Sequence, residues 1–193
     1  GRIADWLRDC QGGIFTAMPT GQGPNTANPR PRIAILTISD AGARGERADT
    51  SGDAIASWAA GRQYVLARRA LVPDETLAIV SALTGWADGG EADLILTTGG
   101  TGPAARDVTP EATRALPDRE APGIAKRIRI ASMDSFPRAA LSRGLAGTRK
   151  RTLIVNLPGS PGGVKDGLAA LDPIVDHAIA VLRADRFDHE EAS

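Results

Sequence analysis

The fold is decided by one stretch of the sequence, Asp93-Leu-Ile-Leu-Thr-Thr-Gly-Gly-Thr-Gly-Pro-Ala-Ala-Arg-Asp-Val-Thr-Pro-Glu-Ala-Thr113. Its apolar start, residues 94–96, is typical of a short strand that is buried on both faces in a parallel sheet. Gly99, Gly100 and Gly102 follow this strand. Because glycine has no side chain to cover the backbone N–H groups, a phosphate can approach the main chain closely here. The order predicts a strand followed by a phosphate-binding loop.

A helix is predicted after the glycine loop. Thr109 can serve as its N-cap, Pro110 as its first residue and Glu111 as an acidic residue in its first turn. Between loop and helix, Arg106 offers a cation for phosphate oxygens and Asp107 a carboxylate for a metal ion. This order favours a nucleotide or phosphate site.

Three other interpretations of the glycines are weaker. A glycine cluster can be only a tight turn between strand and helix. Residues 100–105 match the loose dinucleotide-binding pattern, but Pro103 interrupts it, the helix begins only near Pro110, and Glu120 lies in a linker rather than at the end of a strand. A P-loop needs Gly-Lys-Ser/Thr after the glycines, which this sequence lacks.

Composition limits the function further. The 193 residues suffice for one domain of about 150 residues and an appendage. Lys plus Arg and Asp plus Glu number 23 each, so the zero net charge gives no general attraction to nucleic acid or to an anionic membrane. One cysteine, Cys10, excludes an internal disulfide framework, and two histidines do not suggest a zinc cluster. Without an apolar run of about 20 residues, we expect a cytoplasmic protein with no membrane or nucleic-acid partner.

Strands and helices are predicted to alternate. Strands are expected at 33–38, 63–72, 94–96 and 153–157. Helices are expected to begin near Ser51, which can serve as the N-cap, and near Pro73, and to lie over 110–116, around 124–128, and over 164–171 and 173–182. Residues 133–151 yield no clear prediction. The pattern favours an α/β fold, a single domain with a mostly parallel sheet and helices on both faces, in three layers.

Three segments are expected: a flexible N-terminal extension over 1–31, the α/β domain over 32–184 and a polar tail over 185–193. Ligands bind parallel sheets of this kind outside the carboxyl ends of the strands. The loops 39–52, 72–75, 97–107 and 156–163 each follow a predicted strand, so we expect them to meet at one cleft.

Six short motifs occur in order along residues 32–182. They are Ile-Ser39-Asp40, Asp49-Thr-Ser51-Gly52, Val-Pro-Asp74-Glu75, Thr-Thr-Gly-Gly-Thr-Gly with Arg106-Asp107-Val-Thr-Pro, Leu141-Ser142-Arg143, and Asn156-Leu-Pro-Gly-Ser-Pro161. Together they resemble the molybdopterin adenylyltransferase family, which includes the G domain of gephyrin.

The resemblance implies an enzyme of molybdenum-cofactor synthesis that uses ATP and Mg²⁺ to adenylate molybdopterin and releases pyrophosphate. It also implies a homotrimer. Asp74 and Asp107 match the acidic pair that the family uses for catalysis and metal binding. The residues expected to bind substrate and nucleotide are Ser39, Asp40, Asp49, Ser51, Gly52, Gly99, Gly100, Thr101, Gly102, Arg106, Ser142, Arg143, Asn156, Pro158, Gly159, Ser160 and Lys165.

Several of these residues have alternative roles. Asp74 can be a helix N-cap, Asp107 can form an exposed ion pair with Arg106, and Arg143 and Lys165 can be solvated surface charges. Ser142 can be a turn hydroxyl. The sequence also has Gly162 where the family commonly carries a basic residue, and Lys165 follows three residues later.

Two rival functions remain. A molybdopterin-binding or scaffolding module would keep the cleft without turnover, and a nicotinamide-dependent enzyme would bind NAD(P). Because both Asp74 and Asp107 are present, the sequence favours the adenylating enzyme.

Overall fold

The computed structural model describes residues 30–184. The expected polar tail, and all but the last two residues of the expected N-terminal extension, lie outside this range.

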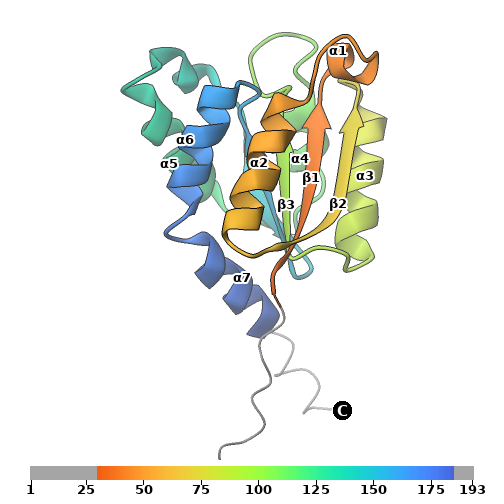
Figure 1. Ribbon diagram of the computed structural model, residues 1–193, viewed down its shortest axis with the longest axis vertical. Helices are drawn as coiled ribbons and strands as arrows, with labels where there is room; N and C mark the ends of the chain where they lie inside the picture. The colour runs from red at the N-terminus through yellow and green to blue at the C-terminus, as the bar shows by residue number, and fades with distance from the viewer. Residues whose placement is uncertain (1–29, 185–193) are drawn as a thin grey trace, which may run out of the picture.

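A six-stranded sheet forms the centre of the domain (Figure 1), with the strand order β2-β1-β3-β6-β5-β4. The strands are β1 (Arg32–Ile38), β2 (Val65–Val72), β3 (Leu94–Thr98), β4 (Arg119–Glu120), β5 (Ala146–Arg149) and β6 (Thr152–Leu157). The first four strands in this order are parallel, and β5 and β4 are antiparallel additions at one edge.

Helices cover both faces of the sheet, as predicted. They are α1 (Asp40–Ala43), α2 (Thr50–Gly61), α3 (Thr76–Asp88), α4 (Thr109–Arg114), α5 (Pro122–Met133), the 3₁₀ helix η1 (Pro137–Leu141), α6 (Pro161–Leu171) and α7 (Val175–Ala184). No helix within residues 30–184 combines the length and the apolar character that crossing a membrane requires.

Alternate residues of the central strands face two separate cores. Ile33 and Ile35 of β1 pack in one core with α2, α5, α6 and α7, whereas Ala34 and Leu36 pack in the other with α3 and α4. The central strands carry runs of consecutive apolar residues, such as Ile33 to Leu36 of β1, because both faces of the sheet are covered. The predicted three-layer α/β fold is therefore confirmed.

The parallel strands also end at the same level. Thr98, the last residue of β3, pairs with Thr37 of β1 and with Leu157, the last residue of β6. The loops that follow these strands consequently lie side by side at the carboxyl ends of the strands. Ligands bind at this end of the sheet in folds of this type.

Residues 133–151, which gave no prediction, contain η1 and the antiparallel strand β5. The sequence of β5, Ala-Gly-Thr-Arg, lacks the alternation of a typical strand, and its Gly147 packs against the backbone of Arg119, where a Cβ would lie 2.8 Å from that carbonyl oxygen. The short partner β4 lies in the segment that looked like a linker. β5 forms by pairing with β6, and β4 forms by pairing with β5, so local sequence could not predict these strands.

Two predicted helix caps are wrong. Asp49, not Ser51, caps α2 and accepts a hydrogen bond from the N–H of Gly52 at 2.8 Å. Thr109 is the first residue of α4, whose N-cap position is Val108, and its hydroxyl donates to the carbonyl of Gly99 at 2.9 Å. Both side chains that were expected to cap a helix instead bind backbone atoms of the loops at the strand ends.

Asp93 joins the N-terminal ends of the sheet to the last helix. Its side chain is buried, and it accepts hydrogen bonds from the N–H of Arg32 at 2.7 Å and from the guanidinium of Arg183 in α7 at 2.8 Å. Burial by itself would raise the pKa of this carboxyl, but the hydrogen bonds from Arg183 and Arg32 outweigh it and the pKa is lowered. The ionised form of Asp93 therefore stabilises the fold.

We expect Asp93→Asn to lower the free energy of unfolding by about 3 kcal/mol at pH 7, because Arg183 loses a buried partner. Since the pKa of Asp93 is depressed, its contribution is complete above about pH 4 and disappears as the pH falls through the native pKa. Urea unfolding at several pH values measures this. The exposed Asp134→Asn is the control, and a difference between Asp93→Asn and wild type that persisted undiminished at pH 2 would contradict the prediction.

Candidate active site

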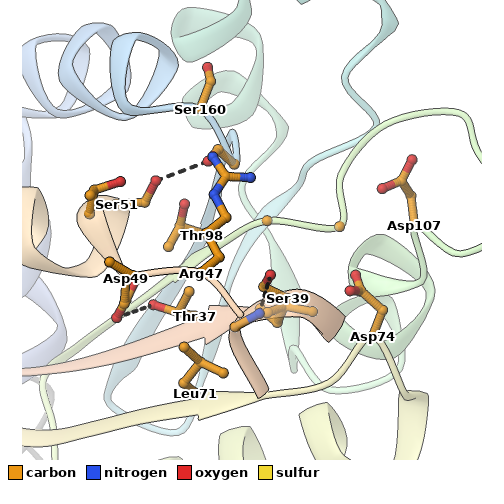
Figure 2. Close-up of a pocket in the computed structure, with 17 residues that line it drawn as sticks. Thr37, Ser39, Arg47, Asp49, Ser51, Leu71, Asp74, Thr98, Asp107 and Ser160 are labelled. Carbon is orange, nitrogen blue, oxygen red and sulfur yellow. Dashed lines mark hydrogen bonds between the residues drawn. The ribbon is translucent and has the colours of Figure 1, made fainter. Parts of the chain in front are cut away.

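A cavity of about 340 Å³ opens at the carboxyl ends of the strands (Figure 2). The four loops that were expected to meet all contribute to its wall. Nine of the predicted site residues line it: Ser39, Asp49, Ser51, Asp74, Gly99, Gly100, Asp107, Gly159 and Ser160.

The glycine loop passes closely over neighbouring backbone. Gly99 has a φ of 101°, and a Cβ there would lie 2.1 Å from the carbonyl oxygen of Ile38. Gly100 has a φ of 60°, and its Cβ would lie 2.4 Å from the hydroxyl of Thr109 and 2.9 Å from a carboxylate oxygen of Asp74. Only glycine has both this backbone freedom and this lack of volume. The loop therefore brings its main chain to the wall of the cavity.

Hydrogen bonds hold the loop after β1 in place. Asp49 accepts from the hydroxyl of Thr37 at 3.0 Å and from the guanidinium of Arg69 at 2.8 Å, in addition to capping α2. A Cβ at Gly52 would lie 2.2 Å from the Asp49 carboxylate, so glycine makes room for this cap. Ser51 donates to the carbonyl of Gly159 at 2.9 Å and so links this loop to the one after β6.

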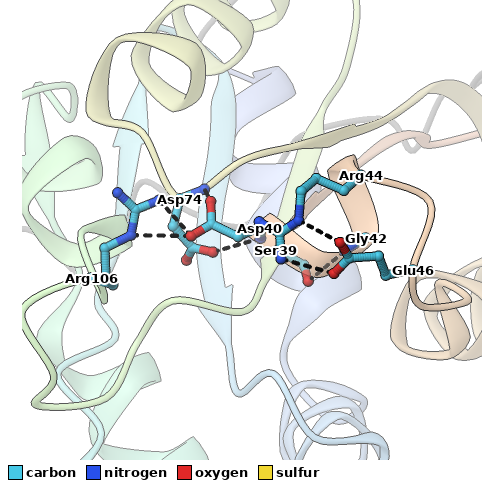
Figure 3. Close-up of polar contacts among 7 residues, drawn as sticks. All are labelled: Ser39, Asp40, Gly42, Arg44, Glu46, Asp74 and Arg106. Carbon is cyan, nitrogen blue, oxygen red and sulfur yellow. Dashed lines mark hydrogen bonds and ion pairs between the residues drawn. The ribbon is translucent and has the colours of Figure 1, made fainter.

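Asp40 and Asp74 bind each other's backbone (Figure 3). The N–H of Asp40 donates to Asp74 at 2.9 Å, and the N–H of Asp74 donates to Asp40 at 3.0 Å. Arg106, in the segment after the glycine loop, donates to Asp40 through its Nε at 3.1 Å. This arrangement joins three of the loops at one rim of the cavity.

The two carboxylates differ in charge environment. The hydrogen bond from Arg106, followed by that from the N–H of Asp74, lowers the pKa of Asp40 below its usual value. Burial raises the pKa of Asp74, and the negative charges of Asp40 and Asp107 raise it further, against the opposing effects of the Asp40 N–H and Arg106. The surroundings of Asp40 therefore stabilise its ionised form, whereas those of Asp74 disfavour its ionised form.

Asp74 and Asp107 are two cavity carboxylates that could serve as ligands of a metal ion. Both line the cavity, and they come from loops after two different strands. Asp74 is not the N-cap of α3, whose cap position is Glu75, and Arg106 pairs with Asp40 rather than with Asp107. Mg²⁺ prefers one or two protein carboxylates together with substrate phosphates. Within residues 30–184 no three His, Cys, Asp or Glu side chains form a group that could hold a metal ion.

A second, more apolar cavity of about 630 Å³ adjoins the first at Gly159 and Ser160, which line both. Its wall includes Phe136 and Leu141 from the segment around η1. The predicted residues Thr101, Gly102, Ser142 and Pro158 lie here.

The remaining predicted residues lie outside both cavities. Arg143 supports the glycine loop by donating to the carbonyls of Gly102 at 2.8 Å and Asp107 at 2.5 Å. Asn156 is buried and donates to the hydroxyls of Thr97 at 2.9 Å and Thr113 at 3.1 Å. Asp40, Gly52, Arg106 and Lys165 are also absent from the two cavity walls.

Sequence reasoning missed Arg47, which lines the first cavity. The residue lies in the loop between α1 and α2, two positions before Asp49. The sequence before it, Ala41-Gly-Ala-Arg-Gly-Glu46, is rich in glycine and also contains Arg44. Nothing in the local sequence distinguishes Arg47 from the neighbouring Arg44.

Comparison with known proteins identifies the family. The model of the "Probable molybdopterin binding domain" matches residues 34–177. The chain belongs to this family. Molybdopterin adenylyltransferase of Escherichia coli K12 is 43% identical over 140 residues, which covers 71% of each chain. That of Helicobacter pylori J99 is 37% identical over 154 residues, 78% of this chain and 86% of the relative.

A solved structure agrees with this result. The molybdopterin biosynthesis enzyme MoaB from Thermus thermophilus is 53% identical, with a TM-score of 0.75 over 79% of this chain and 96% of that one. The resemblance that the six motifs indicated is thereby confirmed.

Gly100→Ala tests the glycine loop. We expect this variant to lose roughly 1–3 kcal/mol of stability, because alanine disfavours the positive φ and its Cβ meets Thr109. Affinity for nucleotide phosphate should fall as well. Gly85→Ala, in α3 with no atom within 4 Å of the added Cβ, is the matched control. Calorimetric unfolding and ATP titration measure the two effects, and unchanged values for both would show that the loop tolerates a side chain.

Proposed function

We propose that this protein adenylates molybdopterin in molybdenum-cofactor biosynthesis, with ATP as the donor of the adenylyl group. The observation that carries the proposal is the placement of Asp74 and Asp107 at one cavity beside the backbone of the glycine loop, in a chain of the molybdopterin-binding family. The names of the E. coli and H. pylori relatives support the same reaction.

In the proposed reaction, an oxygen of the terminal phosphate of molybdopterin attacks the α-phosphorus of ATP. The new P–O bond forms while the bond from the α-phosphorus to the bridging oxygen breaks, and pyrophosphate leaves with that electron pair. Nucleotidyl transfer of this kind is accelerated mainly by positioning and by stabilisation of charge. The close backbone of Gly99 and Gly100 serves positioning, because it lets phosphate oxygens reach main-chain N–H groups.

Asp74 and Asp107 would hold Mg²⁺, which supplies charge stabilisation at the phosphate oxygens. The raised pKa of Asp74 fits this role, since a bound cation favours the ionised carboxylate that the apo site disfavours. The hydrogen bond from the backbone N–H of Asp40 keeps the Asp74 carboxylate oriented without neutralising it.

The decisive experiment incubates the protein with molybdopterin, ATP and Mg²⁺ and measures adenylyl-molybdopterin and pyrophosphate. We expect both products in equal amounts. Binding of molybdopterin without product would show that the chain is instead a binding or scaffolding module. Omission of Mg²⁺, with chelator present, is expected to stop the reaction and tests the metal separately.

Asp74→Asn and Asp107→Asn are each expected to lower turnover by roughly 100-fold or more, because each removes charge that acts in the transition state. Molybdopterin binding should change little. Since the pKa of Asp74 is raised, its ionised form destabilises the fold, so Asp74→Asn should melt at the same or a higher temperature at pH 7. Asp134→Asn is the exposed control, and near wild-type turnover in either site variant would remove that residue from the mechanism.

The resemblance also leads us to propose a homotrimer in the cytoplasm. Sedimentation analysis of the full chain is expected to yield three times the monomer mass of 20.1 kDa. A monomer at micromolar concentration would contradict the trimer.

A further inference from the structure

Arg47 stands out among the charged residues of the first cavity. Among the described residues that line this cavity, it is the only lysine or arginine, against the three carboxylates Asp49, Asp74 and Asp107. Its side chain is exposed to solvent. A ligand with several negative charges therefore meets one protein cation here.

The other arginines near the site are already engaged. Arg69 pairs with Asp49 and Asp53, Arg106 with Asp40, and Arg143 with Glu111. Within residues 30–184, no carboxylate lies within ion-pair distance of the Arg47 guanidinium. As far as this part of the chain is concerned, its charge remains available for a ligand.

The position of Arg47 complements the proposed metal site. In Figure 2 its side chain extends toward the part of the cavity where Ser51 and Ser160 lie, away from Asp74 and Asp107. Ser160 caps the N-terminus of α6, so the helix dipole adds a partial positive charge on the same side. A guanidinium offers paired N–H groups whose geometry matches two phosphate oxygens.

We propose that Arg47 binds a phosphate group of the substrates, on the side of the cavity opposite the two aspartates. The proposal rests on the proposed function, because it assigns the ligand of that same cavity. The chemistry required is an anionic phosphate, and either the polyphosphate of ATP or the phosphate of molybdopterin supplies it. With the metal on one side and Arg47 on the other, the phosphates between them would be held from both directions.

Arg47→Gln tests the assignment, since glutamine keeps a polar side chain at this position but removes the positive charge. Calorimetric titrations with Mg·ATP alone and with molybdopterin alone measure the two possible sources separately. We expect the dissociation constant for at least one of them to rise roughly 10- to 100-fold, the range for a charge-assisted hydrogen bond. The titration that changes identifies the phosphate bound, and Arg47→Lys should lose less affinity than Arg47→Gln.

Arg44→Gln is the matched control. It removes an arginine from the same loop, but Arg44 pairs with Glu46 and does not line the cavity. We expect its affinities and the melting temperatures of all variants to stay near wild type. If Arg47→Gln bound both ligands like wild type, or weakened them no more than Arg44→Gln, the proposal would be overturned.

A second variant restores charge from the first turn of α6. A Cβ at Gly162 meets no atom within 4 Å, and the residue lies two positions after Ser160. We therefore expect Gly162→Lys, added to Arg47→Gln, to recover part of the lost affinity. No recovery would overturn binding through charge on this side of the cavity. These titrations need no turnover, so their outcome is independent of whether wild type forms adenylyl-molybdopterin.

Discussion

The close approach of Gly99 to the carbonyl oxygen of Ile38 is the constraint on which the site depends. A Cβ at this position would lie 2.1 Å from that oxygen, so the chain can turn here only with glycine. The turn carries the backbone across the end of β1 and past Gly159, whose own Cβ would lie 3.0 Å from the Gly99 Cα. Three loops from three neighbouring strands consequently pack against one another through main chain. The cavity exists because these loops can come so near.

Polar bonds then hold the loops at the distances that the glycines permit. Thr109 donates to Gly99, Ser51 donates to Gly159, and the hydroxyl of Thr98 donates to the carbonyl of Pro158 at 2.7 Å. Each bond joins elements that are distant in the sequence or separated by a turn. Side chains with hydroxyl groups therefore maintain the shape of the cavity, which leaves Asp74 and Asp107 as the carboxylates for the proposed metal.

The carboxylates of the loops around the cavity differ in how far arginines neutralise them. Arg106 and Arg69 neutralise Asp40 and Asp49, which are the carboxylates that shape the loops. Asp74 keeps a raised pKa because it is partly buried among other negative charges. A bound cation would lower the pKa of Asp74 and so favour its ionised form.

The sequence by itself determined the α/β architecture and the family, because a run such as Leu94-Ile-Leu96 must be buried on both faces and because six motifs occur in order. It did not predict β4 and β5, since the four residues of β5 become a strand only through pairing with β6. The sequence showed which residue types could form the site, but it did not show which role each residue has. Only the tertiary structure decided that Asn156 is enclosed by threonines, that Arg106 binds Asp40, and that Arg47 faces the cavity. The physical reason is that pairing and burial depend on which loops meet in space, and local sequence carries no record of those distances.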